Sequence, residues 1–337
     1  MSCCNEKAQD ACAPKEPQCE NVCCRLTALE TNVDELFNRT LSLRQEIEEI
    51  SPFVIAFLAD TGTPGETQDK FVSMIASWKP NLVVLGGDNA YSSGTDEQAD
   101  AAFAAFEQFI ELENLIPVVG NHDEITSQIP LYSNYLYRKF PYLYKEAIEG
   151  SGLGEVPYFR MPITAKNAEL FFLYSGVYSN GDFSQYGLAG SALYAARATA
   201  DMANSPAKQV LAFSHHSFVT PNIDGTGIRA YEIRLYPIGS WKSFFVGHTH
   251  TAYHLKGNDG SDYEGFNVFD CSATTETPRL FQSPYALEGR DTADFSTVWK
   301  YDEATRYAIR ISIFSDRHLV EFVNIDGYVN HSYTIKP

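Results

Sequence analysis

The sequence predicts an α/β protein whose strands carry functional side chains at their carboxyl ends. After Pro52, short apolar runs alternate with helical stretches, and each of the first three runs ends in a turn that combines glycine with Asp or Asn. This order of strand, turn, helix and strand is the rhythm of a doubly wound sheet. The chain has 337 residues and is 44% hydrophobic, which is enough to bury a sizeable core.

The chain is expected to have three parts: a cysteine-rich cap over 1–25, an amphipathic or coiled-coil helix over 26–52, and the α/β domain over 53–337. The cap has no hydrophobic period, which is typical of a small stapled or irregular segment. It holds six of the 7 cysteines, namely Cys3, Cys4, Cys12, Cys19, Cys23 and Cys24. Only Cys271 lies in the remainder, so the core does not depend on disulfides.

A heptad pattern predicts the helix over 26–52. Its two seam positions hold Leu26, Val33, Thr40 and Ile47, and Leu29, Leu36, Leu43 and Ile50. The helix is expected to end at Ser51–Pro52, because the residue before proline disfavours helical geometry. Either this helix packs on its own domain, or residues 26–50 form a homo-oligomeric coiled coil that the neighbouring cysteines staple. The seam favours a parallel dimer, while Thr40 leaves a trimer open.

The elements after Pro52 follow from apolar runs and their spacing. Strands are expected at 53–59, 81–85, 116–119, 170–174, 209–213 and 243–246, with helices near 70–78 and 97–109. The segment 307–335 alternates like antiparallel strands, with turns at Ser315–Asp316 and Asp326–Gly327. In doubly wound sheets, ligands bind at the carboxyl ends of the strands.

Composition excludes several classes of protein. A formal net charge of -18 repels phosphate backbones, so a dedicated nucleic-acid partner is not expected. An anionic protein that handles phosphate esters needs a local positive charge, and bound metal is its most direct source. No apolar run approaches the ~20 residues of a transmembrane helix.

Side chains that bind metals follow five of the predicted strands. They are Asp60, Asp88 with Tyr91, Asn121 with His122, His215 with His216, and His248 with His250. A single Asp or His after a strand is usually a cap or a structural residue. Their recurrence at five strand ends instead indicates two metals about 3.5–4 Å apart, with Asp88 as the bridging carboxylate.

Five ordered blocks carry a family resemblance. They are Asp60–Gly62, Gly87–Tyr91, Gly120–Asp123, Ser214–His216 and Gly247–His250. Together they resemble the signature of the calcineurin-like metallophosphoesterases. The residue types at two positions, Gly62 and Tyr91, are similar to those of the purple acid phosphatase branch. The resemblance implies a four-layer sandwich in which two central mixed β-sheets are flanked by helices, preceded here by the heptad helix.

The resemblance also implies the ligands of both metals. A ferric ion would be held by Asp60, Asp88, Tyr91 and His250. A divalent iron, zinc or manganese ion would be held by Asp88, Asn121, His215 and His248. The Tyr91 phenolate would be the source of the purple colour.

Three further residues are expected to serve the reaction. His122 resembles the family's non-ligand histidine, which protonates the leaving alkoxide or holds the phosphate, and Asp123 would orient it. His216 is expected close by, in contact with substrate. One position departs from the family, because Ser217 stands where proline is common.

The expected activity is hydrolysis of a small phosphate monoester by in-line attack of a metal-bound hydroxide. A phosphodiester or nucleotide substrate is a second hypothesis, since related folds use nearly the same ligands. A third is that the domain is displayed on an extracellular oligomeric or filamentous assembly, because hydrolysis does not need the first 52 residues.

The predicted location is extracytoplasmic. The cysteine-rich cap and the sequons at Asn38–Thr40 and Asn330–Ser332 favour an oxidising compartment, although Met1 is not followed by a visible export signal. N-myristoylation is excluded, because it requires glycine where this chain has Ser2.

Overall fold

The computed structural model describes most of the chain in two compact units, Met1–Ser51 and Pro52–Pro337. The described residues are 29–43, 50–91, 96–123, 135–141, 158–176, 188, 191–217, 240–271, 274–276, 278, 295–300 and 305–337. The predicted cysteine-rich cap lies outside these residues.

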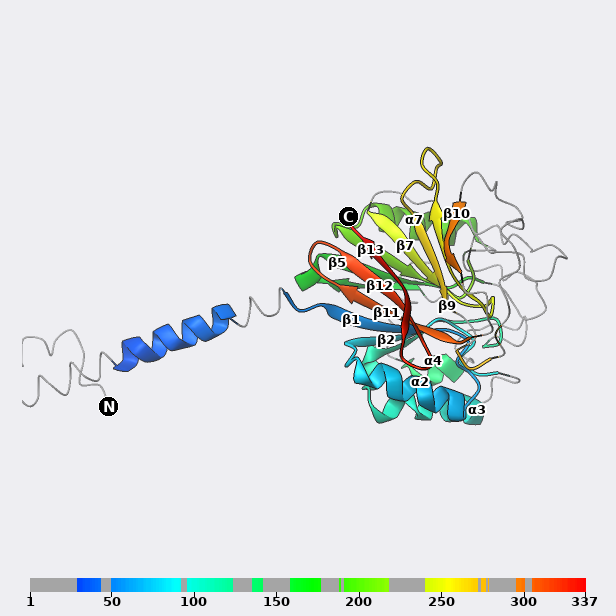
Figure 1. The fold of residues 1–337 in the computed structure, drawn as a ribbon, viewed down its shortest axis with the longest axis horizontal. Coiled ribbons are helices and arrows are strands. Elements are labelled where there is room, and N and C mark those ends of the chain that lie inside the picture. Colours follow the sequence, from blue (N-terminus) through cyan, green and yellow to red (C-terminus); the bar gives the residue numbers. More distant parts are fainter. Residues whose placement is uncertain are drawn as a thin grey trace, which may run out of the picture. The chain divides into compact units, whose positions relative to one another are not determined.

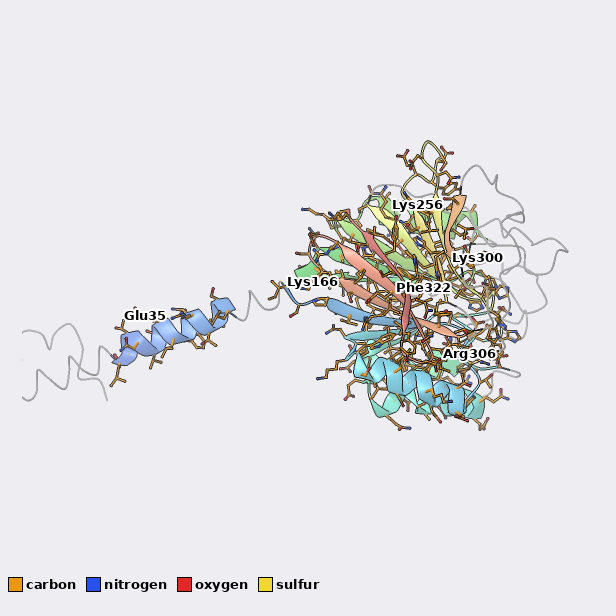
Figure 2. The ribbon with its side chains drawn as sticks, viewed as in Figure 1. Glu35, Lys166, Lys256, Lys300, Arg306 and Phe322 are labelled. Carbon is orange, nitrogen blue, oxygen red and sulfur yellow. The ribbon has the colours of Figure 1, made fainter. Side chains whose placement is uncertain are left out.

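The predicted N-terminal helix is present over residues 29–43. Side chains on every side of it are exposed, and Figure 2 shows them, with Glu35 labelled. The apolar seam is exposed as well: Leu29 has 59% and Leu36 64% of its surface accessible. Thr40, the polar seam residue, donates its hydroxyl to the carbonyl of Leu36 within the helix, at 2.7 Å.

The second unit contains two mixed sheets. The strands of the first sheet are β1 (Phe53–Leu58), β2 (Leu82–Leu85), β3 (Leu115–Pro117), β11 (Tyr307–Ile313), β12 (His318–Asn324) and β13 (Val329–Ile335). Their order is β13-β12-β11-β1-β2-β3. The pairs β1–β2 and β2–β3 are parallel, and the others are antiparallel. The prediction of antiparallel strands over 307–335 is therefore confirmed.

The second sheet lies beside the first. Its strands are β4 (Tyr158–Ile163), β5 (Ala168–Leu173), β6 (Gln209–Phe213), β7 (Trp241–Val246), β8 (Ala252–Gly257), β9 (Asn267–Cys271) and β10 (Phe295–Lys300). Their order is β10-β8-β9-β7-β6-β5-β4. The run β5–β6–β7–β9 is parallel, and the outer pairs are antiparallel.

Helices cover the outer faces of the two sheets, which gives the four layers that the family resemblance implied (Figure 1). They are α2 (Glu66–Ser77), α3 (Asp96–Ala104), α4 (Tyr135–Lys139) and α7 (Ala192–Ala203), with 3-10 turns η2 (Phe106–Gln108), η3 (Leu112–Asn114) and η5 (Thr164–Lys166). α2 lies beneath the first sheet in Figure 1, and its buried residues include Phe71 and Ile75. The predicted fold class is confirmed.

A ladder of phenylalanines fills the interface between the sheets. Phe172, Phe213, Phe245 and Phe269 occupy paired positions on β5, β6, β7 and β9. Their rings lie 5.1–5.3 Å apart and nearly parallel. Phe57 of β1 packs on this ladder from the other sheet, 5.8 Å from Phe213. Each such pair contributes about 0.5–1.5 kcal/mol beyond burial, so the ladder fixes how the sheets face each other.

Predicted boundaries differ from the structure mainly where tertiary contacts decide them. The predicted helix 97–109 ends at Ala104 and continues as a 3-10 turn, while strands β4, β8, β9 and β10 were not anticipated. Within the described residues, no helix is long and apolar enough to cross a membrane.

Candidate metal centre

The predicted ligands follow parallel strands of both sheets. Asp60, Asp88 and Asn121 follow β1, β2 and β3, whereas His215 and His248 follow β6 and β7. The strand ends are tied together by backbone hydrogen bonds, such as Asp60 N to the carbonyl of Gly87 at 3.0 Å. All five side chains therefore converge where the two sheets meet.

One group of ligand atoms contains Asp60, Tyr91 and His250. The Tyr91 hydroxyl donates to Asp60 Oδ1 at 2.9 Å and lies 3.4 Å from His250 Nε2. His250 Nε2 lies 3.2 Å from the same Asp60 oxygen. Metal–ligand bonds of about 2.0–2.2 Å place neighbouring ligand atoms roughly 3 Å apart, so these three atoms suit a single ion.

A second group contains Asp88, Asn121, His215 and His248. His215 Nε2 lies 3.3 Å from Asp88 Oδ1 and 3.0 Å from Asn121 Oδ1. His248 Nδ1 lies 2.9 Å from the same amide oxygen. The other ring nitrogen of His215 donates to the carbonyl of Gly86 at 2.8 Å, which turns Nε2 towards Asp88, as metal-binding histidines require.

Asp88 joins the two groups. The ligand atoms of Asp60, Asp88 and His215 lie within 4.8 Å of one another, and so do those of His215, His216 and His248. The first cluster mixes the two predicted ligand sets, as a bridging carboxylate between them would. Carboxylate, imidazole, phenol and amide donors facing one another fit a pair of ions, and the division of ligands between the ions stays a prediction.

The ligand loops adopt unusual backbone geometry. Asp60, Asp88, His248 and His250 have φ angles of 56°, 53°, 75° and 58°, in the left-handed region. Only two other non-glycine residues among those described, Lys79 and Asn167, do so. Such conformations cost about 1–3 kcal/mol each and concentrate at functional sites.

Close backbone approach explains two of the glycines in the blocks. A side chain at Gly120 would place its Cβ 2.2 Å from Asp88 N and 2.3 Å from Asp88 Oδ1. At Gly87, where φ is +95°, Cβ would lie 2.3 Å from His215 Nδ1. Glycine is therefore needed here for space as well as for conformation.

The family is decided by a comparison with known proteins. The family model of the calcineurin-like phosphoesterases matches residues 53–252. The chain belongs to this family. No curated protein sequence matches the chain.

Solved structures share the fold at low identity. A purple acid phosphatase from yellow lupin (Lupinus luteus) seeds has a TM-score of 0.57 and 12% identity, covering 86% of this chain and 54% of the lupin chain. This chain thus spans about half of that phosphatase. A dimetal phosphatase from Danio rerio has a TM-score of 0.52 and 13% identity, with 85% and 99% covered. GAP50 of Plasmodium has a TM-score of 0.51 and 11% identity, with 85% and 89% covered.

In the candidate site, the pKa values depend on burial, which is opposed by neighbouring charges. Burial alone raises the pKa of Asp60 and Asp88, but His250 and His215 outweigh it and hold both pKa values below the usual range. Burial lowers the pKa of His215, yet Asp88 reverses this and raises it to about 9. His248 has its pKa lowered to about 3 by burial and by His215.

The pKa of Tyr91 is shifted in the opposite direction to those of Asp60 and Asp88. Burial and the charge of Asp60 raise the pKa of its phenol well above the usual value. A phenolate at this position therefore requires the charge of a bound cation.

The structure places His122 and His216 each beside predicted ligands. The His122 ring packs 4.9 Å from that of Tyr91, and its backbone N–H donates to Asp88 Oδ1 at 2.8 Å. His216 is fully buried: its Nδ1 lies 2.7 Å from Ser175 Oγ, and its ring lies 4.1 Å from that of His248. Their roles in the reaction stay predictions.

Asp123 is buried and contacts the loop that carries Asp88. Its carboxylate accepts hydrogen bonds from Asn89, from the backbone of Ala90 and Gly120, and from the Tyr135 hydroxyl. That it also orients His122 stays a prediction.

Several residues behind the ligands were not anticipated. Asp270, at the end of β9, accepts from Thr249, the residue between the two histidines of the fifth block, at 2.8 Å. Thr275 donates its hydroxyl to the carbonyl of Asp60 at 2.9 Å. Asn89 lies within a recognised block, but nothing in the sequence links Asp270 or Thr275 to the site.

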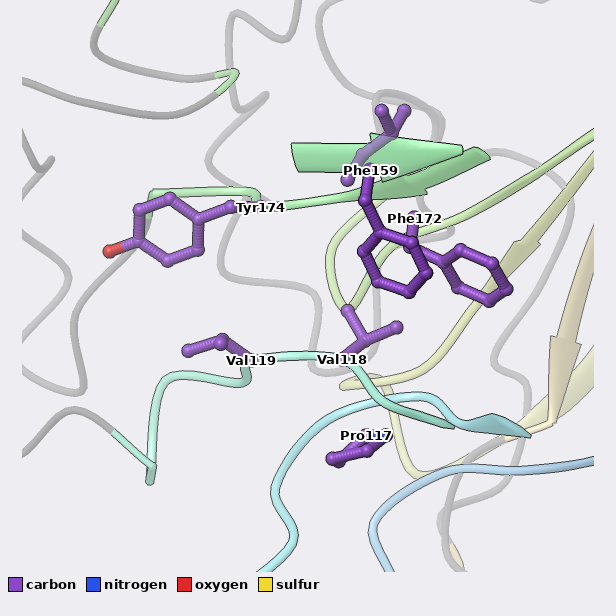
Figure 3. A pocket seen from close by; sticks show the side chains of 7 residues that line it. Pro117, Val118, Val119, Phe159, Phe172 and Tyr174 are labelled. Atoms are coloured by element: carbon purple, nitrogen blue, oxygen red, sulfur yellow. The ribbon is translucent and has the colours of Figure 1, made fainter. Parts of the chain in front are cut away.

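A small apolar pocket lies beside the Asn121 loop. It is lined by Val118, Val119, Phe159, Phe172 and Tyr174, among others (Figure 3). In Figure 3 the Tyr174 hydroxyl points away from the phenylalanine rings. None of the described residues that line the pocket is charged, so they offer no charge to bind phosphate.

Proposed function

We propose that residues 53–337 hydrolyse phosphate monoesters at a dinuclear metal centre, in the manner of the purple acid phosphatases. The observation that carries the proposal is the convergence on Asp88, whose carboxylate lies 3.3 Å from His215 and within 4.8 Å of the ligand atom of Asp60. Bound ions would supply Lewis acidity and lower the pKa of a bound water.

The ligand sets are proposed as the family pattern assigns them. Asp60, Asp88, Tyr91 and His250 would hold Fe(III), supported by the contacts of Tyr91 and His250 with one Asp60 oxygen. Asp88, Asn121, His215 and His248 would hold divalent iron, zinc or manganese, supported by the two histidines that face Asn121 Oδ1.

The residues around the ligands have proposed roles in turnover. His122 stands beside Tyr91 and Asp88, where its side chain protonates the leaving alkoxide or holds the phosphate. His216 is proposed to contact the substrate. Because the net charge is -18, the negatively charged substrate is attracted by the local charge of the centre and not by the protein surface.

The decisive experiment measures metal content, colour and turnover together. The wild-type protein should contain two metal equivalents, absorb visible light when it contains iron, and hydrolyse an aryl phosphate. Asp88→Ala should lose metal and turnover, whereas Asp316→Ala, which changes an exposed carboxylate, should lose neither. Turnover by metal-free protein would refute the proposal. Iron-loaded, active but colourless protein would refute only the purple acid phosphatase assignment.

Phosphodiesters and nucleotides are the alternative substrates of the same site. Rates on an aryl monoester and on the corresponding diester distinguish them. A diester rate that exceeds the monoester rate would change the proposed substrate but leave the metal centre intact.

A role as a displayed domain is the second candidate. It is supported by the exposed seam of the N-terminal helix and by GAP50, which has a similar fold and is described as an anchor in the inner membrane complex of Plasmodium. We propose that residues 26–50 form a homo-oligomeric coiled coil, stapled by the cysteines of an extracytoplasmic protein. The size of the protein in solution with and without residues 1–52, under reducing and non-reducing conditions, tests it.

A further inference from the structure

Asp123 makes an unusual number of hydrogen bonds for one buried side chain. Its Oδ1 accepts from the backbone N–H of Asn89 at 2.9 Å, from that of Ala90 at 3.3 Å and from the Tyr135 hydroxyl at 2.5 Å. Its Oδ2 accepts from Asn89 Nδ2 at 2.9 Å and from the backbone N–H of Gly120 at 2.8 Å. Both oxygens therefore face donors.

These donors require a carboxylate. An amide at position 123 has one acceptor oxygen and one NH₂ group, so it would turn its NH₂ towards at least two of these N–H groups. Burying such donors without acceptors costs about 1–3 kcal/mol each. Asp123 is only 4% exposed, so bulk water has little access to the donors that would lose their acceptor.

Four of the five donors belong to the two loops that carry ligands, and the fifth, the Tyr135 hydroxyl, lies on α4. Asn89 and Ala90 directly follow Asp88, whose φ angle of 53° is strained. Gly120 directly precedes Asn121 in the other loop. Asn89 strengthens the link, because its amide also donates to the carbonyl of Val118 at 2.7 Å.

The distance between the two loops determines where their ligands meet. Gly120 lies against Asp88 so closely that an added Cβ would sit 2.3 Å from the carboxylate oxygen. His122 N–H donates to the same oxygen at 2.8 Å. A shift of either loop would therefore change the position of Asp88 relative to Asn121.

We propose that Asp123, Asn89 and Tyr135 form a positioning clamp that sets the spacing of Asp88 and Asn121 and thereby the affinity of the centre for its metals. This inference rests on the dinuclear centre of the proposed function. The clamp acts through the ligand loops: Asp123 is a positioning residue, and its effect reaches turnover through metal binding. This differs from a role in orienting His122, which would change turnover and leave metal affinity unaltered.

The test is a calorimetric titration of the metal-stripped full chain with Mn²⁺, accompanied by its melting temperature. Asp123→Asn should bind Mn²⁺ about 10- to 100-fold more weakly, as is common when a residue that orients metal ligands is changed. Tyr135→Phe removes one of the five donors and leaves the carboxylate, so it should weaken binding roughly 2- to 10-fold with little change in melting temperature.

Glu169→Gln is the matched control. Glu169 is a buried carboxylate that accepts a hydrogen bond from Ser205 at 2.5 Å. It lies outside the five blocks that contain the predicted metal ligands. This variant should bind Mn²⁺ as the wild type does, even if it melts at a lower temperature.

The outcomes separate the two proposals. Wild-type affinity in Asp123→Asn, or in Tyr135→Phe if Asp123→Asn does not fold, would overturn the clamp alone. Reduced turnover at unchanged Mn²⁺ affinity would also overturn it, in favour of a role in orienting His122. A wild-type protein that binds no Mn²⁺ would overturn the dinuclear centre and the clamp with it.

Discussion

At the scale of single residues, the site is built from side chains held in costly conformations. Four of the predicted ligands have positive φ, although none of them is glycine. Such residues persist only where the surroundings over-determine them. Here the surroundings include Asp123 behind the Asp88 loop, Asp270 behind the fifth block, and Thr275 behind Asp60.

His122 allows binding and chemistry to be separated at one residue. Its contacts with Asp88 are made by the backbone, so His122→Ala preserves them. We expect His122→Ala to keep both metal equivalents and to lower kcat by about 10²–10⁴, the usual contribution of a general acid. Metal analysis and steady-state kinetics on an aryl phosphate measure the two effects.

His331→Ala is the control for this prediction. His331 is a partly exposed histidine of β13 that stacks on Trp299, outside the five ligand blocks. It should keep wild-type kcat. Loss of metal from His122→Ala, or a kcat equal to that of the wild type, would contradict the assigned role.

At the scale of elements, each strand of the parallel runs has two tasks. Its interior positions build the core: Phe213 of β6 stacks between Phe172 and Phe245. In β1, β2, β3, β6 and β7 the carboxyl end then delivers a predicted ligand, as β6 does with His215. Because strands cannot shift in a packed ladder without losing these contacts, the ladder also fixes the positions of the ligands.

The N-terminal helix, described over residues 29–43, has an exposed apolar seam. Leu36 lies at a seam position and is 64% exposed. In a coiled coil it would be buried in every copy, and burying a leucine contributes about 1.5–3 kcal/mol. We therefore expect Leu36→Asp to weaken self-association of the full chain by roughly two orders of magnitude or more, measured by sedimentation equilibrium.

Leu41→Asp is the matched control, because it places the same residue in the same helix but away from the heptad seam. Leu41 is 43% exposed. This variant should associate as the wild type does. A monomeric wild-type protein, or equal effects of the two substitutions, would argue against the coiled coil.

At the scale of the whole molecule, buried neutral histidines make stability depend on pH. Burial lowers the pKa of His318 to about 3. The amide of Gln209 donates to the carbonyls of Lys166 and Phe314, so its oxygen accepts from His318 Nδ1 at 3.0 Å. His318 Nε2 then accepts from the hydroxyl of Ser243 at 2.7 Å.

The sign of the effect follows from where the proton binds. Between pH 6.5 and about 3, the unfolded chain protonates this histidine and the folded protein does not. The contribution of His318 to stability is therefore fully present above pH 6.5 and falls as the pH decreases, by about 1.4 kcal/mol per pH unit. In urea unfolding of metal-stripped protein from pH 7 to 4, His318→Asn should reduce the pH slope by about that amount.

Ser243→Ala serves as the control, since it removes a hydrogen bond of His318 but keeps the imidazole. It should lower stability while retaining the wild-type pH slope. If His318→Asn and the wild type have the same slope, His318 does not contribute to acid sensitivity.

The parts of the fold that the sequence predicts are those encoded locally. The strand Gln209–Phe213 was predicted with its observed bounds because a buried strand is a continuous apolar run. β8 and β9 were missed, since His254, Asn267 and Asp270 interrupt their apolar pattern. These polar residues can be buried because they form hydrogen bonds with one another or with polar neighbours, such as that between His254 Nε2 and Asn267 Oδ1 at 2.9 Å.

The sequence by itself determined the α/β class, the family blocks and the set of residues brought to the site, because each follows from short-range pattern: apolar runs, turn glycines and the side chains directly after them. Only the tertiary structure supplied the distances that bring Asp88, predicted as the bridge, close to Asp60 and His215, and only it placed Asp123 and Tyr135 against the loop that carries Asp88. Those relations join segments that are distant in the chain, and they depend on how two sheets pack through a ladder of aromatic rings. The sequence pattern alone does not give the distances between such segments.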